Sequence, residues 1–506
     1  MSDAKHAQLS STDIVANCEK EQLHLSGQIQ NFGALLVADS ESMQIRYVSD
    51  NTNDILGIKA ETLVGQSLSE QTWFDTALCS EVGRSEGARV CRFDHRIGSK
   101  KVNLRVLRGE NTFVVEAEPV NLQGSNWSLS ELRAILYPPT HTEWKAKDYW
   151  EKLLTAISSV LPFHRLLLYR FEDDWTGEVI SEHARKDDVE YLGLKFPASD
   201  IPQIARKMYF ENPSRLIDHV DQPPVDILGD SDTPPDLTWS DLRSVSPVHA
   251  QYLRNMGITT SFSIPVILSG NLWGIVSCHH PSHLHVDAQS RYQSEQLVKH
   301  FCSIYATFLS RQRLSLLSTI DDKINSITAQ MSLLDGSGEA LTLLLNETTV
   351  TCSGTFSAVV MNGSWTCSTG DADIPLLNKI DKYFRQDTSD YILSNTNIRL
   401  LQGLEAIDEG DVRGVMVIKL DHSRDNTRLY IFRRPEKQLV EWAGNPDKSK
   451  AQVSETGSLS PRQSFEKWTE VKGEASLPWS KSDFLFAKKA RVGLMRFFNQ
   501  IRSNHV

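Results

Sequence analysis

The segment FPASDIPQIARKMY, residues 196–209, contains a predicted helix start with an acidic residue and a proline close together. Ser199 suits the N-cap position, and Asp200 then falls in the first turn, where a carboxylate favours the helix dipole. Pro202 falls where a missing backbone N–H costs nothing. Taken alone, this segment is an ordinary helix start. Any function of Asp200 depends on residues elsewhere in the chain.

Composition limits the class of protein. The chain has 506 residues, of which 40% are hydrophobic and 23% charged, and this predicts a soluble globular protein of roughly three domains. The net charge of −11 is modest and the basic residues are scattered, so no nucleic-acid partner is expected. No apolar run approaches the roughly 18 residues of a membrane span, and the first residues lack a signal-peptide core. We therefore expect a cytoplasmic protein with no membrane partner.

The cysteines do not form a recognisable framework. None of the seven cysteines belongs to a CxxC pair, so neither disulfides nor a metal site is predicted. Six lie in apolar surroundings and are expected to be small core residues: Cys79, Cys91, Cys278, Cys302, Cys352 and Cys367. Cys18 differs because it lies in the polar segment NCEKEQ, just before the first strand pattern. A loop cysteine without a role and a reactive thiol both remain open on this evidence.

Hydrophobic periodicity predicts an α+β chain of three domains. Residues 1–125 alternate short apolar runs with turn signals, which is typical of a small strand-rich sheet domain. Residues 140–312 contain a predicted helix at about 147–161 and further strand and helix patterns, which indicate a second α+β domain with antiparallel strands. Residues 320–506 contain strand patterns near 355–361, 413–420 and 428–434 and are assigned to a third domain.

Two helical segments stand out in the second half of the chain. From about residue 287 the apolar period becomes 3.6, with spacings of four, three and four between Leu297, Phe301, Ile304 and Phe308. This pattern predicts a helix well over 25 residues long that connects domains or forms a coiled-coil seam. The last segment repeats apolar residues at three and four spacing: Ala487, Ala490, Leu494, Phe497 and Ile501. We expect this second stripe to point out of the protein, toward a partner or a further domain.

A long segment of the third domain, about 435–480, is rich in turn-forming residues and poor in apolar anchors. A loop of this length inside a compact domain is usually functional or disordered. The segment is therefore a candidate for function.

Polar side chains that suit one kind of ligand gather between residues 209 and 279. Ser261 and Ser263 share one face of a predicted strand because side chains alternate along it. Arginines, hydroxyls and imidazoles beside aromatic rings suit a large, flat, conjugated ligand that carries carboxylates. The candidates are Tyr209, Arg215, Arg243, Ser246, His249, Tyr252, Ser261, Ser263 and His279. Each has an ordinary alternative explanation, as a surface arginine, a solvent-facing serine or a core histidine.

Five motifs give the chain a family resemblance. They are NCEKEQLH around Cys18, FPASDIP, SPVHAQYLRNMG from Ser246, LWGIVSCHH from Leu272, and WAGNP followed by SPRQSFEKWTE. In this order and at this spacing, the chain resembles the photosensory core of a bacterial phytochrome over essentially its whole length. The resemblance implies a PAS domain at 1–125, a GAF domain at 140–312 and a PHY domain at 320–506. It also implies a knotted PAS–GAF junction, a long connecting helix and a C-terminal signalling helix.

The resemblance implies a covalently bound pigment. Cys18 would form a thioether to the A-ring side chain of biliverdin, a linear tetrapyrrole, with its thiolate as the nucleophile. Relatives that attach their pigment in the GAF domain carry a cysteine just before the motif histidine, where this chain has Val248. The family pattern therefore favours biliverdin on Cys18.

Roles for the other candidates follow from the same resemblance. The two propionates would be held by Tyr209, Arg215, Arg243, Ser246, Ser261 and Ser263. Asp200, in a motif with Ile201 and Pro202, would offer its backbone carbonyl to the pyrrole N–H groups, and His249 would join it through a water. His279 would meet the D-ring carbonyl. The D-ring would be surrounded by Tyr169, Phe196 and Tyr252.

In the family, the segment at about 435–480 is a tongue that reaches from the PHY domain to the GAF domain. The resemblance pairs Arg462 of the tongue with Asp200, and a buried pair of this kind is costly to break from one side. Rotation of the D-ring in light would release Arg462, and Ser464 and Trp468 would repack as the tongue changes from hairpin to helix. The segment would thus be a two-state switch.

One departure from the family pattern is visible near residue 30. Many relatives read QPHGALL where this chain reads QNFGALL, so Asn31 and Phe32 replace a proline and a histidine. Ile29, which the family pattern threads through a GAF loop, is present. The substitution affects the expected local packing and not the expected pigment binding.

Three functions compete. The first is a red and far-red photoreceptor, expected to be a parallel homodimer that regulates a histidine kinase or diguanylate cyclase beyond this chain. The second is an enzyme, but the chain has no phosphate-binding loop, kinase glycines, GGDEF-type signature or HExxH motif. The third is a pigment-free PAS and GAF scaffold that binds a small ligand or only dimerises. The third leaves the joint presence of Cys18, Asp200 and Arg462 without a reason.

Overall fold

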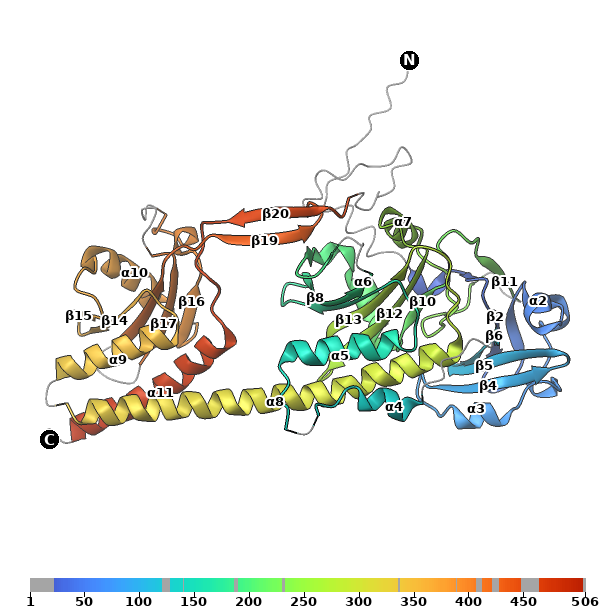
Figure 1. Cartoon of the computed structure of the whole chain (residues 1–506), viewed down its shortest axis with the longest axis horizontal. Helices are drawn as coiled ribbons and strands as arrows, with labels where there is room; N and C mark the ends of the chain where they lie inside the picture. Colours follow the sequence, from blue (N-terminus) through green and yellow to red (C-terminus); the bar gives the residue numbers. More distant parts are fainter. Residues whose placement is uncertain are drawn as a thin grey trace, which may run out of the picture. The chain divides into compact units, whose positions relative to one another are not determined.

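The computed structural model describes residues 22–120, 128–139, 141–185, 190–229, 233–334, 337–387, 389–405, 412–420, 427–446 and 464–503. Cys18 and Arg462, to which the family resemblance assigned roles, lie outside the described residues. The chain divides into two compact units (Figure 1): Met1–Ala306 with Glu441–Trp468, and Thr307–Val440 with Thr469–Val506. Both units combine helices with antiparallel sheets, so the predicted α+β class is confirmed.

The first unit contains a seven-stranded sheet in the order β1-β11-β3-β2-β6-β5-β4. Its strands are β1 (Gln28–Ile29), β2 (Ala34–Asp39), β3 (Ile45–Ser49), β4 (Arg89–Ile97), β5 (Lys100–Arg108), β6 (Thr112–Pro119) and β11 (Val225–Gly229). Short helices lie beside it: η1 (Leu23–Leu25), α2 (Thr52–Leu56), η2 (Ala60–Thr62), η3 (Leu68–Glu70) and α3 (Ala77–Glu81). Strand β11 comes from far along the chain, which the sequence patterns did not predict.

The segment around residue 30 joins this sheet to later parts of the chain. Ile29 is fully buried, pairs with Val225 of β11 and forms an isolated bridge with Arg243. Phe32, which departs from the family pattern, is also buried, and the Arg291 guanidinium lies 5.7 Å from the centre of its ring. The phenyl ring is thus accommodated by a cation–π contact.

A second sheet in the first unit has the order β10-β12-β13-β7-β8-β9-β19-β20. Its strands are β7 (Arg165–Phe171), β8 (Gly177–Ala184), β9 (Lys195–Phe196), β10 (Arg215–Ile217), β12 (Thr260–Leu268), β13 (Asn271–His280), β19 (Gln438–Ala443) and β20 (Lys467–Lys472), of which β19 and β20 continue into the second unit. The helices are α4 (Leu129–Ala134), α5 (Ala146–Ser158), η4 (Ala198–Asp200), α6 (Gln203–Glu211), α7 (Pro247–Asn255) and α8 (Ala288–Ser332).

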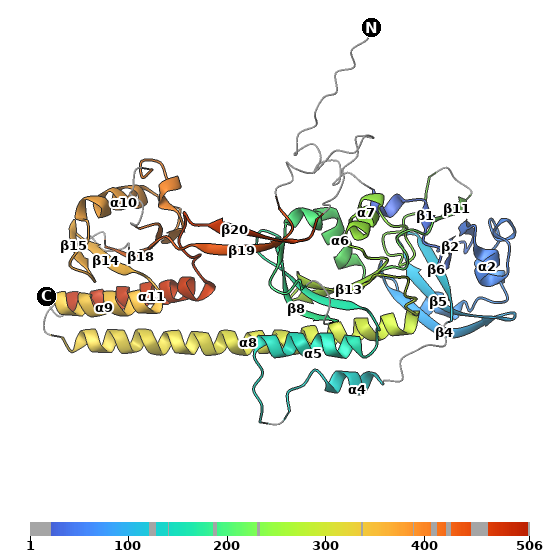
Figure 2. The ribbon, with the colours of Figure 1, turned by 45° about the horizontal axis from the view of Figure 1, so that its top comes forward.

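Helix α8 has 45 residues, in agreement with the predicted long helix. Figure 1 and Figure 2 both show α5 beside the first part of α8. The ring centres of Tyr149 and Tyr305 are 5.9 Å apart across this contact. In the described ranges, no helix combines the length and the apolar character that crossing a membrane requires.

The second unit is built on a five-stranded sheet in the order β15-β14-β18-β17-β16. Its strands are β14 (Phe356–Met361), β15 (Ser364–Cys367), β16 (Ile392–Asn395), β17 (Gly414–Lys419) and β18 (Arg428–Arg433). Its helices are α9 (Ser337–Thr351), α10 (Ile374–Gln386), η5 (Ile398–Leu400) and α11 (Lys481–Ser503), together with the later part of α8.

The expectation that the apolar stripe of the last helix points out of the protein is wrong for its first half. Ala487, Ala490 and Leu494 of α11 are at most 2% exposed. They belong to a core cluster with Ile320 and Ile324 of α8 and with residues of α9, β17 and β18. The stripe exists because α11 is a core helix of its own unit, where burial of the apolar face stabilises the fold.

Candidate functional site

One face of the second sheet carries polar side chains in two rows that run across the strands. Ser261 of β12 lies opposite His279 of β13, and Ser263 lies opposite both Ser277 of β13 and Arg215 of β10. Because side chains alternate along a strand, both rows face the same side of the sheet. Ser277 Oγ lies 2.7 Å from His279 Nε2. Ser277 was not among the predicted site residues, although its spacing of two from His279 could have indicated it.

Two arginines lie at the edge of this face. Arg215 donates hydrogen bonds of 2.6 to 3.2 Å to backbone carbonyls of residues 241–244. Arg243 donates to the carbonyls of Leu237 and Thr238 at 3.2 and 3.1 Å. Neither arginine forms an ion pair with a carboxylate in the part of the chain that the structure describes. Both guanidinium groups are therefore hydrogen-bonded to backbone carbonyl oxygens.

Electrostatics at these arginines favour a bound anion. Burial lowers the pKa of Arg215 to about 10, although the nearby Asp241 acts in the opposite direction. Burial, together with the Arg215 cation, lowers the pKa of Arg243 to about 9. A lowered arginine pKa means that the surroundings do not fully compensate the charge. A carboxylate ligand at this position would supply the missing compensation.

The two histidines lie in dense protein but are not fully covered. Burial lowers the pKa of His249 to about 4 and that of His279 to about 3, with arginine cations adding to both shifts. His249 is nevertheless solvent-accessible, and His279 is half-buried. An accessible ring that is surrounded by protein is typical of a cavity wall. His279 Nδ1 has no hydrogen-bond partner among the described residues, so one ring nitrogen remains available to a ligand.

The predicted helix start at Ser199 is wrong. Ser199 and Asp200 lie in the short 3-10 turn η4, and helix α6 begins only at Gln203, with Pro202 as its N-cap. Ile201 adopts φ −123° and ψ 87°, because a residue before proline disfavours helical angles. Asp200 is therefore outside the first turn of α6. Its carboxylate instead accepts a hydrogen bond of 3.1 Å from Tyr252 Oη.

Aromatic residues complete the face. Tyr169 and Phe196 are buried, and their ring centres are 5.8 Å apart. Tyr252 stacks on the ring of His249 with a centre distance of 6.0 Å and an angle of 12°. Tyr209 Oη lies 3.0 Å from Ser263 Oγ. Of the remaining predicted residues, Ser246 is half-buried at the N-cap of α7, and Ile201 packs against the core cluster that contains Tyr169 and Phe196.

Residues 441–446 and 464–468 bring the segment named above as a tongue to this face. Trp442 of β19 pairs in parallel with Lys195 of β9, and Gly444 N–H donates to the Glu466 carbonyl at 2.9 Å. Phe465 is 7% exposed, and its ring meets that of Tyr252 edge to face at 5.1 Å. The sequence prediction missed Phe465, although it directly follows Ser464 in the SPRQSF motif. Tyr252 thus contacts both Asp200 and the tongue.

The other two described tongue candidates lie on the surface. Ser464 is exposed, and its hydroxyl accepts only a long 3.4 Å hydrogen bond from the Glu466 N–H. Trp468 is 36% exposed. Of the described tongue residues, Phe465 and Ala443 lie in the core cluster with Tyr169 and Phe196. Ser464 and Trp468 remain predictions for a second state.

The contact between Phe465 and Tyr252 gives a prediction for the tongue. Phe465→Ala removes a buried ring, so residues 441–446 should open more often, and the Gly444 amide should exchange hydrogen at least about tenfold faster. Trp468→Ala is the matched control, because its ring is partly exposed and should change this exchange little. Hydrogen exchange with mass spectrometry measures both variants. Equal exchange rates in the two variants would contradict the role given to Phe465.

Comparison with known proteins identifies three kinds of domain in the chain. Family models match at residues 18–120 (PAS fold), 148–307 (GAF domain) and 349–503 (Phytochrome region). The bacteriophytochrome of Pseudomonas aeruginosa is 30% identical over 95% of this chain and 66% of its own length. Cyanobacterial phytochrome B of Nostoc is likewise 30% identical over 95% of this chain and 66% of its own length.

Solved structures agree in fold. A bacteriophytochrome from R. palustris has a TM-score of 0.80 at 22% identity and covers 96% of this chain and 99% of its own. The photosensory core of the Stigmatella aurantiaca phytochrome has a TM-score of 0.80 at 24% identity, over 98% of this chain and 99% of its own. The fold is therefore that of a PAS, GAF and PHY photosensory core.

The chain belongs to the phytochrome family of light photoreceptors and has the three-domain core of a bacteriophytochrome. It spans 66% of the length of the Pseudomonas and Nostoc relatives.

Proposed function

We propose that this chain senses red and far-red light through biliverdin that is attached to Cys18 and lies against the polar face of the second sheet. One observation carries the proposal: two rows of polar side chains lie on one face of the sheet, Arg215–Ser263–Ser277 and Ser261–His279. At the edge of this face, neither Arg215 nor Arg243 forms an ion pair with a carboxylate in the described structure. A linear tetrapyrrole with two propionates has the matching charges and shape.

The described residues fit such a pigment at three points. Arg215 and Arg243 keep uncompensated charge, which suits two carboxylates. His279 keeps one buried ring nitrogen without a partner, which suits a carbonyl or N–H at the far end of the ligand. Tyr169 and Phe196 give the face an apolar end, which suits a conjugated ring. The arrangement thus has a charged side and an aromatic side.

When bound, biliverdin supplies absorption of red light and a double bond that isomerises at its D-ring. In our proposal, Arg215, Arg243, Tyr209, Ser246, Ser261 and Ser263 hold the propionates. The Asp200 carbonyl and His249 orient the pyrrole nitrogens, and His279 holds the D-ring end. Ile201 and Pro202 keep the Asp200 carbonyl outside α6, in agreement with the late start of that helix.

The proposed switch is the contact of Asp200 with the tongue. The Asp200 carboxylate accepts from Tyr252, whose ring packs on Phe465. We propose that Arg462 pairs with Asp200 in one state and is released in the other, where Ser464 and Trp468 repack as the tongue changes from hairpin to helix. A change of the hydrogen bond at Asp200 would then reach the tongue through one side chain, because Tyr252 makes both contacts.

We further propose that the tongue signal is passed through α8 to an output domain, a histidine kinase or a diguanylate cyclase, in a parallel homodimer in the cytoplasm. The length of α8, which is shared by both units, supports such a path. The relatives are longer than the matched region, since the chain spans 66% of the Pseudomonas bacteriophytochrome.

Recognition of the propionates can be tested with paired ligands. Biliverdin and its dimethyl ester have the same ring system, but only the first carries carboxylates. In a Cys18→Ser background, where binding is reversible, we expect biliverdin to bind at least about 30-fold more tightly than the ester, because even one buried charge pair is worth about 2 kcal/mol or more. Arg215→Met with Arg243→Met should remove this preference.

The control for this test is Arg254→Met, since Arg254 is 40% exposed and pairs with Asp221 at the surface. It should keep the preference for the free acid. If the double variant also keeps that preference, the two arginines do not hold the propionates.

A further inference from the structure

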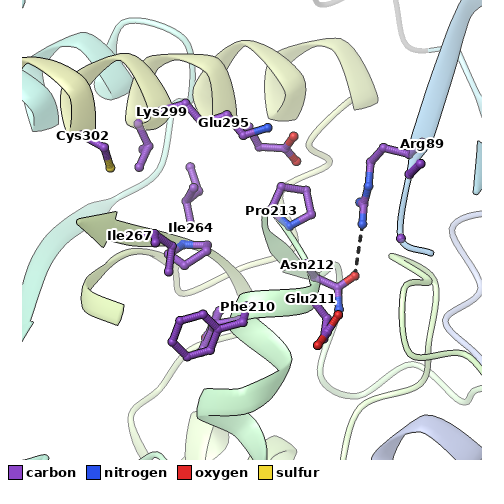
Figure 3. A pocket seen from close by; sticks show the side chains of 15 residues that line it. Arg89, Phe210, Glu211, Asn212, Pro213, Ile264, Ile267, Glu295, Lys299 and Cys302 are labelled. Carbon is purple, nitrogen blue, oxygen red and sulfur yellow. Dashed lines mark hydrogen bonds between the residues drawn. The ribbon is translucent and has the colours of Figure 1, made fainter. Parts of the chain in front are cut away.

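A pocket lies beside the candidate pigment site and has no role in the proposed function. Its volume is about 550 Å³, within the range of small-molecule sites. Figure 3 shows Glu295, Lys299 and Cys302 on one helix, α8, which lies across the pocket from Ile264 and Ile267 of β12. Phe210 and Pro213, at the end of α6, and Arg89 form further walls.

The polar wall of this pocket has an unbalanced charge. Glu295 is 7% exposed, and its carboxylate accepts a hydrogen bond of 2.6 Å from Ser214 Oγ. It forms no ion pair within the described ranges. Burial, and the nearby Asp241 carboxylate, raise the pKa of Glu295. A buried carboxylate of this kind is stabilised by a cation that approaches from the pocket.

The cationic side chains around the pocket do not form an ion pair with the Glu295 carboxylate in the described structure. The Arg89 guanidinium is directed to Asp241 at 3.3 Å and to Asn212 at 3.4 Å, so its charge is already used. Lys299 is exposed, and solvent screens its charge. The apolar part of the lining includes Ile264 and Ile267 on one side and Phe210, which is 51% exposed, on another.

We propose that this pocket binds a small amphipathic cation, in which an alkylammonium group is attached to an aromatic ring system. The ammonium group pairs with Glu295, and the ring packs against Ile264, Ile267 and Phe210. An organic anion of the same size is disfavoured, because its carboxylate would lie beside the buried Glu295 carboxylate.

The pocket is connected to the candidate pigment site by one residue. Tyr209 lines the pocket, and its hydroxyl lies 3.0 Å from Ser263 Oγ on the polar face. Movement of Tyr209 on light absorption would alter the pocket, and an occupant of the pocket would bias Tyr209 in return. This coupling rests on the proposed function, whereas binding of the amine does not.

The experiment compares two probes with one ring system and opposite charge, tryptamine and indole-3-acetate. Isothermal titration calorimetry on the pigment-loaded protein in the dark should show saturable binding of tryptamine with a dissociation constant below about 1 mM and no binding of indole-3-acetate. Glu295→Gln keeps the shape and should weaken tryptamine at least about 30-fold. Glu211→Gln is the matched control at the exposed rim and should change affinity less than about threefold.

A filling variant supplies a second readout. Cys302→Phe should block the binding of tryptamine and leave the absorption spectrum of the pigment unchanged. If this variant fails to fold, the affinity of Glu295→Gln for tryptamine tests the proposal without it. The proposal is overturned by absence of saturable tryptamine binding, by equal binding of indole-3-acetate, or by unchanged affinity in Glu295→Gln. Equal tryptamine affinity in dark and lit protein would overturn the coupling only. Tryptamine binding by a protein that stays colourless would refute the proposed function and leave the pocket assignment standing.

Discussion

Replacement of Asp241 by alanine is expected to lower the free energy of unfolding by about 3 to 5 kcal/mol, because it removes a buried carboxylate that pairs with both Arg89 and Arg105. Asp241 is 4% exposed, and its carboxylate bonds Arg105 directly and Arg89 at 3.3 Å. Arg105 also pairs with Glu116 and Glu118 at 3.1 and 3.6 Å. The network ties β5 and β6 of the first sheet to the segment that carries Arg243, so its loss should affect the whole first unit.

Chemical denaturation followed by circular dichroism measures this loss. Asp221→Ala is the matched control, because its carboxylate also pairs with an arginine, Arg254 at 2.7 Å, but is 59% exposed. Exposed pairs contribute about 0 to 1 kcal/mol, so the control should unfold almost as the parent does. Similar losses in both variants would mean that the buried network does not hold the first unit together.

Cys18→Ser is expected to abolish covalent attachment of biliverdin entirely. Burial raises the pKa of Cys79 and of Cys302 to about 11 and that of Cys352 to about 12. The pKa values of Cys278 and Cys367 are raised by burial as well. These thiols stay protonated at neutral pH and are therefore poor nucleophiles. The chain thus offers few competitors to Cys18, which lies in a polar segment.

A denaturing gel stained with zinc detects the attached pigment by its fluorescence. The band should be present in the parent and in Cys367→Ser, the control, and absent in Cys18→Ser. A band that persists without Cys18 would place the attachment on another thiol. Loss of the band in the control would mean that the assay reports protein folding and not the attachment site.

The sequence predicted the parts of the site that depend on local periodicity. Ser261 and Ser263 share a face because they lie two residues apart in one strand, and the register of β12 and β13 adds His279 to that face. The pairing of Ile29 with Val225 could not be derived from local patterns, because it joins segments far apart in the chain. Only the family resemblance pointed to this junction.

Two errors show what local patterns leave out. The helix start at Ser199 was predicted from capping preferences, but Ile201 precedes a proline, and this delays α6 until Gln203. The apolar stripe of α11 indicated a buried face correctly, but a stripe does not say what covers it. In the structure, Leu494 packs within its own unit.

The site prediction was incomplete where it relied on motif positions alone. Phe465 lies in the quoted motif, but its contact with Tyr252 depends on the pairing of β19 with β9, which no motif indicates. The roles of Cys18 and Arg462 stay predictions, because both lie outside the described residues.

The most direct test of a pigment on the polar face of the second sheet is the absorption spectrum of the chain assembled with biliverdin. We expect a blue-green protein that absorbs red light. Its absorption should shift to the far-red on illumination, and this shift should be reversible. A colourless protein, or a bound pigment whose spectrum does not change under red and far-red light, would contradict this expectation.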